Sequence, residues 1–235
     1  MCAEYYLPLA QLLADRGVAV QLVTLPGYNG TEPIPDLNWE RLLETLLPVV
    51  SKHRALIGHS LGGLCSIPLA AKLGDDLDHL ILMEPGVVPW KSVARFGAWW
   101  YRRSVVDRKE PEFKNRGPWY WRIHDPDRFP PEAMEIVLRS DASTDIETPR
   151  GLTGRFADLY PLPFEDIRAK TLMVRGGSSG VMMAWGSWLV GRRLEANYAV
   201  IPDAGHWMAN EQDALLAEAI GGFLEDSGNT VAVGP

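Results

Sequence analysis

The segment Gly-His-Ser-Leu-Gly at residues 58–62 constrains the fold more than any other part of the chain. A short apolar run, residues 54–57, precedes it and is typical of a buried strand, while the small and apolar residues through Leu73 suit a helix packed on a sheet. A strand that turns sharply into a helix through Gly-x-Ser-x-Gly is a nucleophile elbow. The serine is held in a strained backbone conformation, and we expect side chains at the two glycine positions to collide across the turn. Ser60 is therefore the candidate nucleophile, and a plain glycine-rich turn is the alternative.

Strand-like and helix-like segments alternate along most of the chain. Short Val- and Leu-rich runs predict strands, and apolar residues at helical spacing predict helices. The expected strands are 18–25, 54–58, 80–83, 171–174 and 198–201, and the expected helices are 3–16, 38–50, 63–73, 182–193 and 213–223. This alternation predicts an α/β fold with a mostly parallel sheet and helices on both of its faces.

The regular alternation stops between residues 86 and 160, where helical stretches are expected at 91–103, 131–139 and 150–159. The composition changes here too. Residues 86–130 contain ten basic and five acidic side chains and five of the nine tryptophans, in a chain whose net charge is −7. We therefore predict a core formed by residues 1–85 and 161–235, with a helical cap inserted at 86–160.

Bulk composition narrows the possible functions. The longest apolar runs fall far short of the roughly 20 residues that span a bilayer, and Glu4 precedes any apolar stretch, unlike in a signal peptide. Two cysteines, Cys2 and Cys65, are too few for a disulfide framework, so a cytoplasmic location is expected. The acidic net charge argues against nucleic-acid binding, and the five scattered histidines have no metal-ligand spacing. We expect neither a metal nor an organic cofactor.

The sequence resembles the α/β-hydrolase family over essentially its whole length. The resemblance rests on the elbow at 58–63, the strand–helix alternation, the cap-like insertion, and Ile-Pro-Asp-Ala-Gly-His-Trp at residues 201–207. It implies a serine hydrolase whose triad follows the chain order nucleophile, acid, histidine. His206 matches the general base of the family, and it also follows an expected strand end on a loop where glycine precedes it.

The triad acid is less obvious. The family usually carries it on the loop after the strand expected at 171–174, but residues 175–180 contain no carboxylate. Some members use an acid at the end of the preceding core strand, where this chain has Glu84. Asp203, three residues before His206, is the rival, and a Ser–His dyad is the remaining possibility.

The resemblance also implies a further strand and an oxyanion-hole loop before the helix at 3–16, where this sequence has only Met1 and Cys2. The backbone N–H of Leu61 supplies the other oxyanion donor. The missing strand normally lies between those expected at 18–25 and 54–58. Two explanations are open: a shortened form of a longer hydrolase, or a sheet in which 18–25 pairs directly with 54–58.

The cap is expected to cover Ser60. Its aromatic residues predict a pocket for an apolar or aromatic acyl group, although they also suit the cap's own small core. Its basic residues predict either an anionic partner or only a solvated face. These basic residues are Arg95, Arg102, Arg103, Arg108, Lys109, Arg116 and Arg122.

Other residues near these motifs are expected to pack rather than to react. His59 is expected to point away from the nucleophile as a packing residue. The helix with Met182, Met183, Trp185 and Trp188 is expected to be buried against the sheet, and a place in the pocket lining stays open for one or two of these side chains.

The first functional hypothesis is a hydrolase of a small carboxylic ester or a related thioester, lactone, amide or C–C bond. Ser60 attacks, His206 moves the proton, Glu84 orients His206, and Leu61 N–H holds the oxyanion. The second is a catalytically silent protein of the same fold that binds a ligand. The sequence favours no particular oligomeric state.

Overall fold

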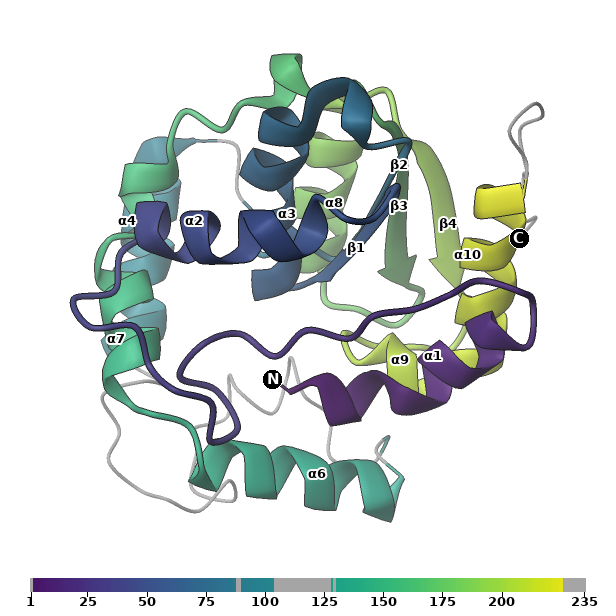
Figure 1. Cartoon of the computed structure of the whole chain (residues 1–235), viewed down its shortest axis with the longest axis horizontal. Helices are drawn as coiled ribbons and strands as arrows, with labels where there is room; N and C mark the ends of the chain where they lie inside the picture. Colours follow the sequence, from purple (N-terminus) through teal and green to yellow (C-terminus); the bar gives the residue numbers. More distant parts are fainter. Residues whose placement is uncertain (1, 88–89, 104–127, 129, 226–235) are drawn as a thin grey trace.

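Four short apolar segments form one parallel sheet, at the centre of the computed structural model (Figure 1). The structure describes residues 2–87, 90–103, 128 and 130–225. The strands lie in the order β1-β2-β3-β4, each parallel to its neighbour. They are β1 (Ala55–His59), β2 (His79–Met83), β3 (Lys170–Gly176) and β4 (Asn197–Ile201). The α/β fold with a parallel sheet is therefore confirmed.

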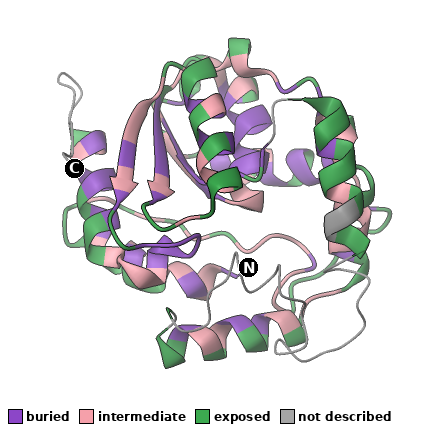
Figure 2. Cartoon of the chain, turned by 180° about the vertical axis from the view of Figure 1, so that it is seen from behind, coloured by how far each residue is buried: buried purple, intermediate pink, exposed green. Residues whose placement is uncertain are grey.

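The inner strands are buried on both faces, as their nearly continuous apolar sequences require. Successive side chains of β2 alternate between two hydrophobic clusters, because neighbouring residues of a strand point to opposite faces. Ile81 and Met83 pack into one cluster, and Leu80 and Leu82 into the other. Figure 2 shows the strands mostly in the colours of buried and intermediate residues. A sheet of this kind needs helices on both sides.

One face is covered by the two ends of the chain. It is packed by η1 (Ala3–Tyr6), α1 (Leu7–Ala14), α9 (Met208–Glu211) and α10 (Asp213–Glu225). Helix α1 lies against α10 (Figure 1). The helix expected at 3–16 is thus a 3₁₀ turn followed by a shorter α-helix, and Gly17 ends it with a φ of 83°. A positive φ is readily adopted by glycine.

The opposite face is covered by α2 (Trp39–Val50), α3 (Leu61–Leu73) and α8 (Val181–Arg193). Helix α2 begins as expected, because the side chain of Asn38 accepts a hydrogen bond of 2.9 Å from the backbone N–H of Arg41. Helix α3 packs directly on β1 and β2. It therefore holds the end of β1 against the sheet.

Residues 18–25 do not form the strand expected from their Val- and Leu-rich sequence, and they do not pair with β1. The alternating burial of a strand is present, with Val18 and Val20 packed against the cluster around α1, but the segment is coil (Figure 1). Its side chains make isolated hydrogen bonds instead: Thr24 Oγ1 accepts from the backbone N–H of Ala3, and Gln21 Oε1 lies 2.5 Å from Nε2 of His53. An extended segment becomes a strand only when a neighbouring strand supplies the hydrogen-bond ladder. The sheet ends at β1 in the described part of the chain.

Between β2 and β3 the described residues are helical. The elements are α4 (Lys91–Tyr101), α6 (Pro131–Ala142), α7 (Glu147–Gly154) and η6 (Phe156–Leu159). Two short 3₁₀ turns, η2 (Gly74–Asp76) and η7 (Phe164–Asp166), lie before β2 and β3. Helix α4 packs against α7 and η6, and α6 against η1. The helical character of the insertion was expected, whereas its separation from the core as a cap stays a prediction.

No helix in the described ranges has the length and apolar character needed to cross a membrane.

Candidate active site

Ser60 lies in the turn between β1 and α3, with a φ of 52° and a ψ of −114°. Such a conformation is strained for a residue with a side chain and persists only where the surroundings hold it. Its backbone N–H donates to Met83 O at 3.0 Å, and its carbonyl accepts from the N–H groups of Leu64 and Gly86 at 3.0 and 3.1 Å. The expected sharp turn is therefore present, and its backbone is held by α3 and by the segment after β2.

Only one of the two motif glycines is required by sterics. A Cβ at Gly58 would lie 2.7 Å from both the carbonyl oxygen of Gly62 and Cα of Gly63, whereas a Cβ at Gly62 would meet no atom within 4 Å. Gly63, just outside the pentapeptide, is the second crowded position, with Cβ of Pro85 at 2.9 Å. The expectation of a collision at Gly62 was wrong, because the turn packs residues 58 and 63 against each other and leaves residue 62 facing open space.

Glu84 directly follows β2 and is fully buried. Its backbone N–H donates to Val174 O at 3.0 Å, and its side-chain Oε1 accepts from the backbone N–H of Gly176 at 2.9 Å. A buried carboxylate without partners would carry a large desolvation cost, which these hydrogen bonds offset. The end of β3 thus fixes the carboxylate in place.

His206 lies on the loop between β4 and α9 and is 5% exposed. Its Nδ1 lies 2.8 Å from Oε2 of Glu84. Because a carboxylate accepts hydrogen bonds, the contact places a proton on Nδ1 of the neutral ring and leaves Nε2 as the basic nitrogen. The structure therefore brings together two of the predicted site residues, which are 122 positions apart in the sequence.

Asp203 is placed differently from Glu84. It is exposed, has a φ of 54°, and its backbone carbonyl accepts a hydrogen bond from Arg128 at 2.8 Å. The loop after β3 lies close to the loop of His206 at Gly176. This close approach requires glycine, because a Cβ at residue 176 would collide with the carbonyl oxygens of Ala204 and Gly205. Of the two carboxylates considered from the sequence, the one beside the His206 ring is Glu84.

His59, expected to be a packing residue, has polar contacts on both ring nitrogens. Nδ1 lies 2.7 Å from the hydroxyl of Tyr6, and Nε2 lies 2.7 Å from the carbonyl oxygen of His206. The rings of His59 and His206 are 4.7 Å apart between centroids. The neighbour of Ser60 in the chain therefore contacts the residue predicted as the general base. No sequence signal links Tyr6, His59 and His206.

Glu211 is a further residue that the sequence did not single out. Its side chain is 5% exposed, and its Oε2 accepts a hydrogen bond of 2.7 Å from the backbone N–H of Gly205. Arg128 lies 3.8 Å from the same oxygen. Glu211 thus fastens the residue before His206 to helix α9.

Leu61, the predicted oxyanion donor, is the first residue of α3. The first N–H groups of a helix have no partner inside it and point toward its N-terminal end, where the dipole favours negative charge. Ser60 directly precedes this helix end. The geometry is that of a site at which an anion can form beside the serine.

The large apolar side chains of α8 are more exposed than expected. On α8, Met182 is 77% exposed and Trp185 and Trp188 are about half exposed, so this helix is not buried against the sheet along that side (Figure 2). Trp90, which precedes α4, lies 5.5 Å from Trp185 between ring centroids. Several predicted cap residues lie outside the described residues: Arg108, Lys109, Arg116, Trp119, Trp121 and Arg122, with the side chain of Trp100.

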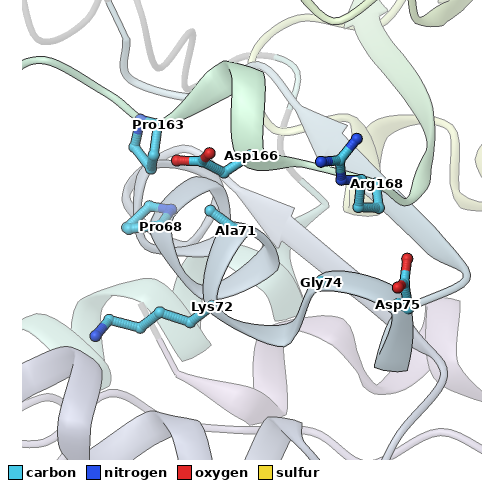
Figure 3. Close-up of a pocket in the computed structure, with 8 residues that line it drawn as sticks. All are labelled: Pro68, Ala71, Lys72, Gly74, Asp75, Pro163, Asp166 and Arg168. Carbon is cyan, nitrogen blue, oxygen red and sulfur yellow. The ribbon is translucent and has the colours of Figure 1, made fainter.

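A groove of about 530 Å³ lies away from Ser60, Glu84 and His206 (Figure 3). Gly74 and Asp75, before β2, and Arg168, before β3, line it, so it lies at the edge of the sheet where strands begin. Ser60, Glu84 and His206 follow strand ends at the opposite edge. Because Lys72, Asp75, Asp166 and Arg168 give the groove mixed charge, it does not match the expected apolar acyl pocket.

Ser60 lies in a strained strand–helix turn after β1, and the buried pair of Glu84 and His206 follows β2 and β4. All three therefore lie at the carboxyl edge of the sheet, which is where open α/β sheets bind their ligands. The sequence model of the alpha/beta hydrolase family matches residues 2–219, so the chain belongs to this family. No curated protein sequence matches it.

Solved structures share the fold at low sequence identity. MenH from S. aureus superposes with a TM-score of 0.77 at 17% identity, covering 97% of this chain and 91% of that one. A thermophilic esterase from Thermogutta terrifontis gives 0.73 at 22% identity, covering 96% and 86%. E-2-(acetamidomethylene)succinate hydrolase gives 0.70 at 20% identity, covering 95% and 87%. At these identities the comparison shows the shared fold alone and leaves activity and substrate open.

Proposed function

We propose that this protein is a serine hydrolase that cleaves a small carboxylic ester or a related acyl bond. The observation that carries the proposal is the buried contact of 2.8 Å between Glu84 and His206, at the sheet edge where Ser60 occupies a strained turn. A protein that only binds a ligand has no need of this combination. The proposed triad is Ser60, His206 and Glu84.

The reaction follows from the roles that the geometry allows. Ser60 Oγ attacks the carbonyl carbon of the substrate, while Nε2 of His206 takes the hydroxyl proton. Glu84 stabilises the imidazolium that forms, through its contact with Nδ1. The N–H of Leu61 donates to the oxyanion. The C–O bond to the leaving group then breaks, His206 returns the proton to the departing oxygen, and water releases the acyl group by the same steps.

The substrate class rests on the family and on the fold neighbours. Among those neighbours are proteins described as an esterase and as a succinate-derivative hydrolase, which supports an acyl-transfer reaction on a small molecule. We also propose that residues 86–160 form a cap over the site, with an apolar or aromatic acyl pocket beneath it. The exposed side chains of Trp90 and Trp185 support such a surface. Cys2 and Cys65 are free thiols, which supports a cytoplasmic location.

A panel of p-nitrophenyl esters with acyl chains from two to twelve carbons tests the proposal. The native protein is expected to release p-nitrophenol faster than the buffer, with a preference for one chain length, whereas Ser60→Ala is expected to match the buffer. Equal rates for the native protein and Ser60→Ala would contradict the proposal. His53→Gln, a histidine substitution away from the triad, is a matched control for handling and folding.

A catalytically silent ligand-binding protein is the second candidate. The observation in its favour is that residues 18–25 stay outside the sheet, so β1 lacks a strand partner on one side within the described residues. Reaction of Ser60 with a serine-directed probe discriminates between the two candidates, because a silent protein does not activate its serine.

A further inference from the structure

His59 connects two parts of the chain that are distant in sequence. Its Nδ1 lies 2.7 Å from the hydroxyl oxygen of Tyr6 in η1, and its Nε2 lies 2.7 Å from the carbonyl oxygen of His206. The rings of Tyr6 and His59 meet edge to face. The imidazole therefore bridges the N-terminal segment and the backbone of the proposed general base.

The carbonyl partner decides which nitrogen of His59 carries the proton. A carbonyl oxygen only accepts hydrogen bonds, so Nε2 must donate to it. In the neutral ring Nδ1 is then an acceptor, and the Tyr6 hydroxyl donates to it. Both nitrogens of a neutral His59 are thereby satisfied, as a buried polar group requires.

The surroundings of His59 favour its neutral form. Burial, and after it the neighbouring His206, hold the pKa of His59 well below 6.5, and the hydrogen bond to the His206 carbonyl opposes this only in part. A charge on His59 would lie beside the ring of His206, 4.7 Å away between centroids, and would disfavour the protonation of His206 during turnover. A neutral His59 holds the loop without this repulsion.

The same N-terminal segment contacts the His206 loop at two more points. The hydroxyl of Tyr5 donates to Trp207 O at 3.2 Å, and Nδ2 of Asn210 donates to Tyr5 O at 2.9 Å. Tyr5 therefore contacts residues 207 and 210 directly, and Tyr6 reaches the backbone of His206 through His59. His59 is the member of this set that is adjacent to Ser60 in the chain.

We propose that His59 is a positioning residue: its imidazole links Tyr6 to the backbone carbonyl of His206 and thereby sets the distance between His206 and Ser60. This inference rests on the proposed function. His59 does not touch the substrate in this role, and acts through the backbone of His206.

Three variants test the role of His59 in catalysis. His59→Leu cannot donate to the His206 carbonyl, whereas His59→Gln has an amide N–H near the position of Nε2. The control His79→Leu changes a partly buried histidine at the beginning of β2, on the opposite edge of the sheet. Ester hydrolysis is measured for kcat and KM separately, and the melting temperature is recorded for each variant.

His59→Leu is expected to lower kcat by about 100-fold with KM within about threefold of native, because small misplacement of a catalytic group has effects of this size. His59→Gln is expected to restore most of kcat, and His79→Leu to match the native protein. If His59→Leu fails to fold, Tyr6→Phe removes one oxygen atom and is expected to lower kcat by about three- to tenfold. A native kcat in folded His59→Leu or in Tyr6→Phe, or a His59→Gln as slow as His59→Leu, would overturn the proposal.

A measurement without substrate separates this inference from the proposed function. Imidazole ¹⁵N spectra of the native protein, with His59 assigned by its loss in His59→Gln, are expected to show the Nε2–H tautomer, unchanged between pH 8 and pH 6. An Nδ1–H tautomer, or a ring that titrates in this range, would overturn the link even in an active enzyme. If the spectra agree but the native protein hydrolyses no ester and reacts with no serine-directed probe, the proposed function fails, and with it the catalytic role of His59.

Discussion

Oε2 of Glu84 lies 2.8 Å from Nδ1 of His206, and both side chains are buried, although β3 and the helical insertion separate them in the sequence. The contact forms because parallel strands end at one edge of the sheet. Glu84 follows β2, His206 follows β4, and β3 lies between these strands and donates the N–H of Gly176 to the same carboxylate. The proposed acid and the proposed base are therefore fixed to the ends of strands of the sheet.

Replacing Glu84 by Gln is expected to lower kcat for ester hydrolysis by about 10⁴-fold, because loss of the proposed orienting carboxylate would leave His206 in the wrong tautomer. Asp203→Asn, at the exposed carboxylate, is expected to stay within about twofold of native. Steady-state kinetics of the two variants on one ester make the comparison. A larger loss in Asp203→Asn than in Glu84→Gln would assign the acid to the other residue.

Glu211→Ala is expected to destabilise the fold by about 1–3 kcal/mol, because the N–H of buried Gly205 loses its acceptor. Glu211→Gln keeps an acceptor oxygen and is expected to retain most of the stability. Urea unfolding of both variants gives the difference in the free energy of unfolding. Equal losses in the two variants would show that the negative charge of Glu211, rather than its hydrogen bond to Gly205, stabilises the loop.

Gly58→Ala is expected to unfold the protein or to destabilise it by more than about 3 kcal/mol, because the new Cβ would lie 2.7 Å from backbone atoms of residues 62 and 63. Gly62→Ala is a matched control with the same change in side chain, and it meets open space. Its melting temperature is expected to stay within a few degrees of native. The reverse order of stabilities would contradict the geometry of the turn.

Stability is expected to fall in mild acid partly because of His59. The pKa of His59 is lowered on folding, so below about pH 6.5 the unfolded chain binds a proton at this position more readily than the folded protein does. The free energy of unfolding is therefore highest above about pH 6.5 and decreases as the pH falls below that value. His59 faces Tyr6 and His206, and its contribution to stability is therefore expected to fall as the pH is lowered from 7.5 to 5.5. Urea unfolding at both pH values is expected to show a smaller pH dependence of the free energy of unfolding in His59→Gln than in the native protein. An unchanged dependence would mean that His59 accepts a proton in the folded protein.

The sequence predicted the elements whose patterns are local. The elbow, the Asn38 cap of α2 and the four strands of the sheet follow from short-range spacing of apolar residues, glycine and polar caps. Glu84 and His206 were singled out by the resemblance to the family, and the gathering of residues after parallel strands at one edge agreed with that choice. The prediction failed at residues 18–25, where the apolar alternation is present but no neighbouring strand provides hydrogen bonds.

The contacts that hold the His206 loop could not be predicted from the sequence. Tyr6 meets His59 across 53 positions, and His59 meets His206 across 147 positions, both through tertiary packing. Glu211 accepts a hydrogen bond from the backbone N–H of Gly205. No periodicity or motif carries such information. The histidine next to Ser60 was expected to pack, because its side chain was expected to point away from the nucleophile.

The most direct test of the account is the reaction of the native protein with a fluorophosphonate at pH 7.5, followed by intact-mass and peptide-mass analysis. The account predicts one covalent adduct on Ser60, formed rapidly in the native protein, slowly in Glu84→Gln, and absent in Ser60→Ala. Absence of an adduct on the folded native protein, or an adduct on a residue other than Ser60, would contradict the assignment of Ser60 as an activated nucleophile.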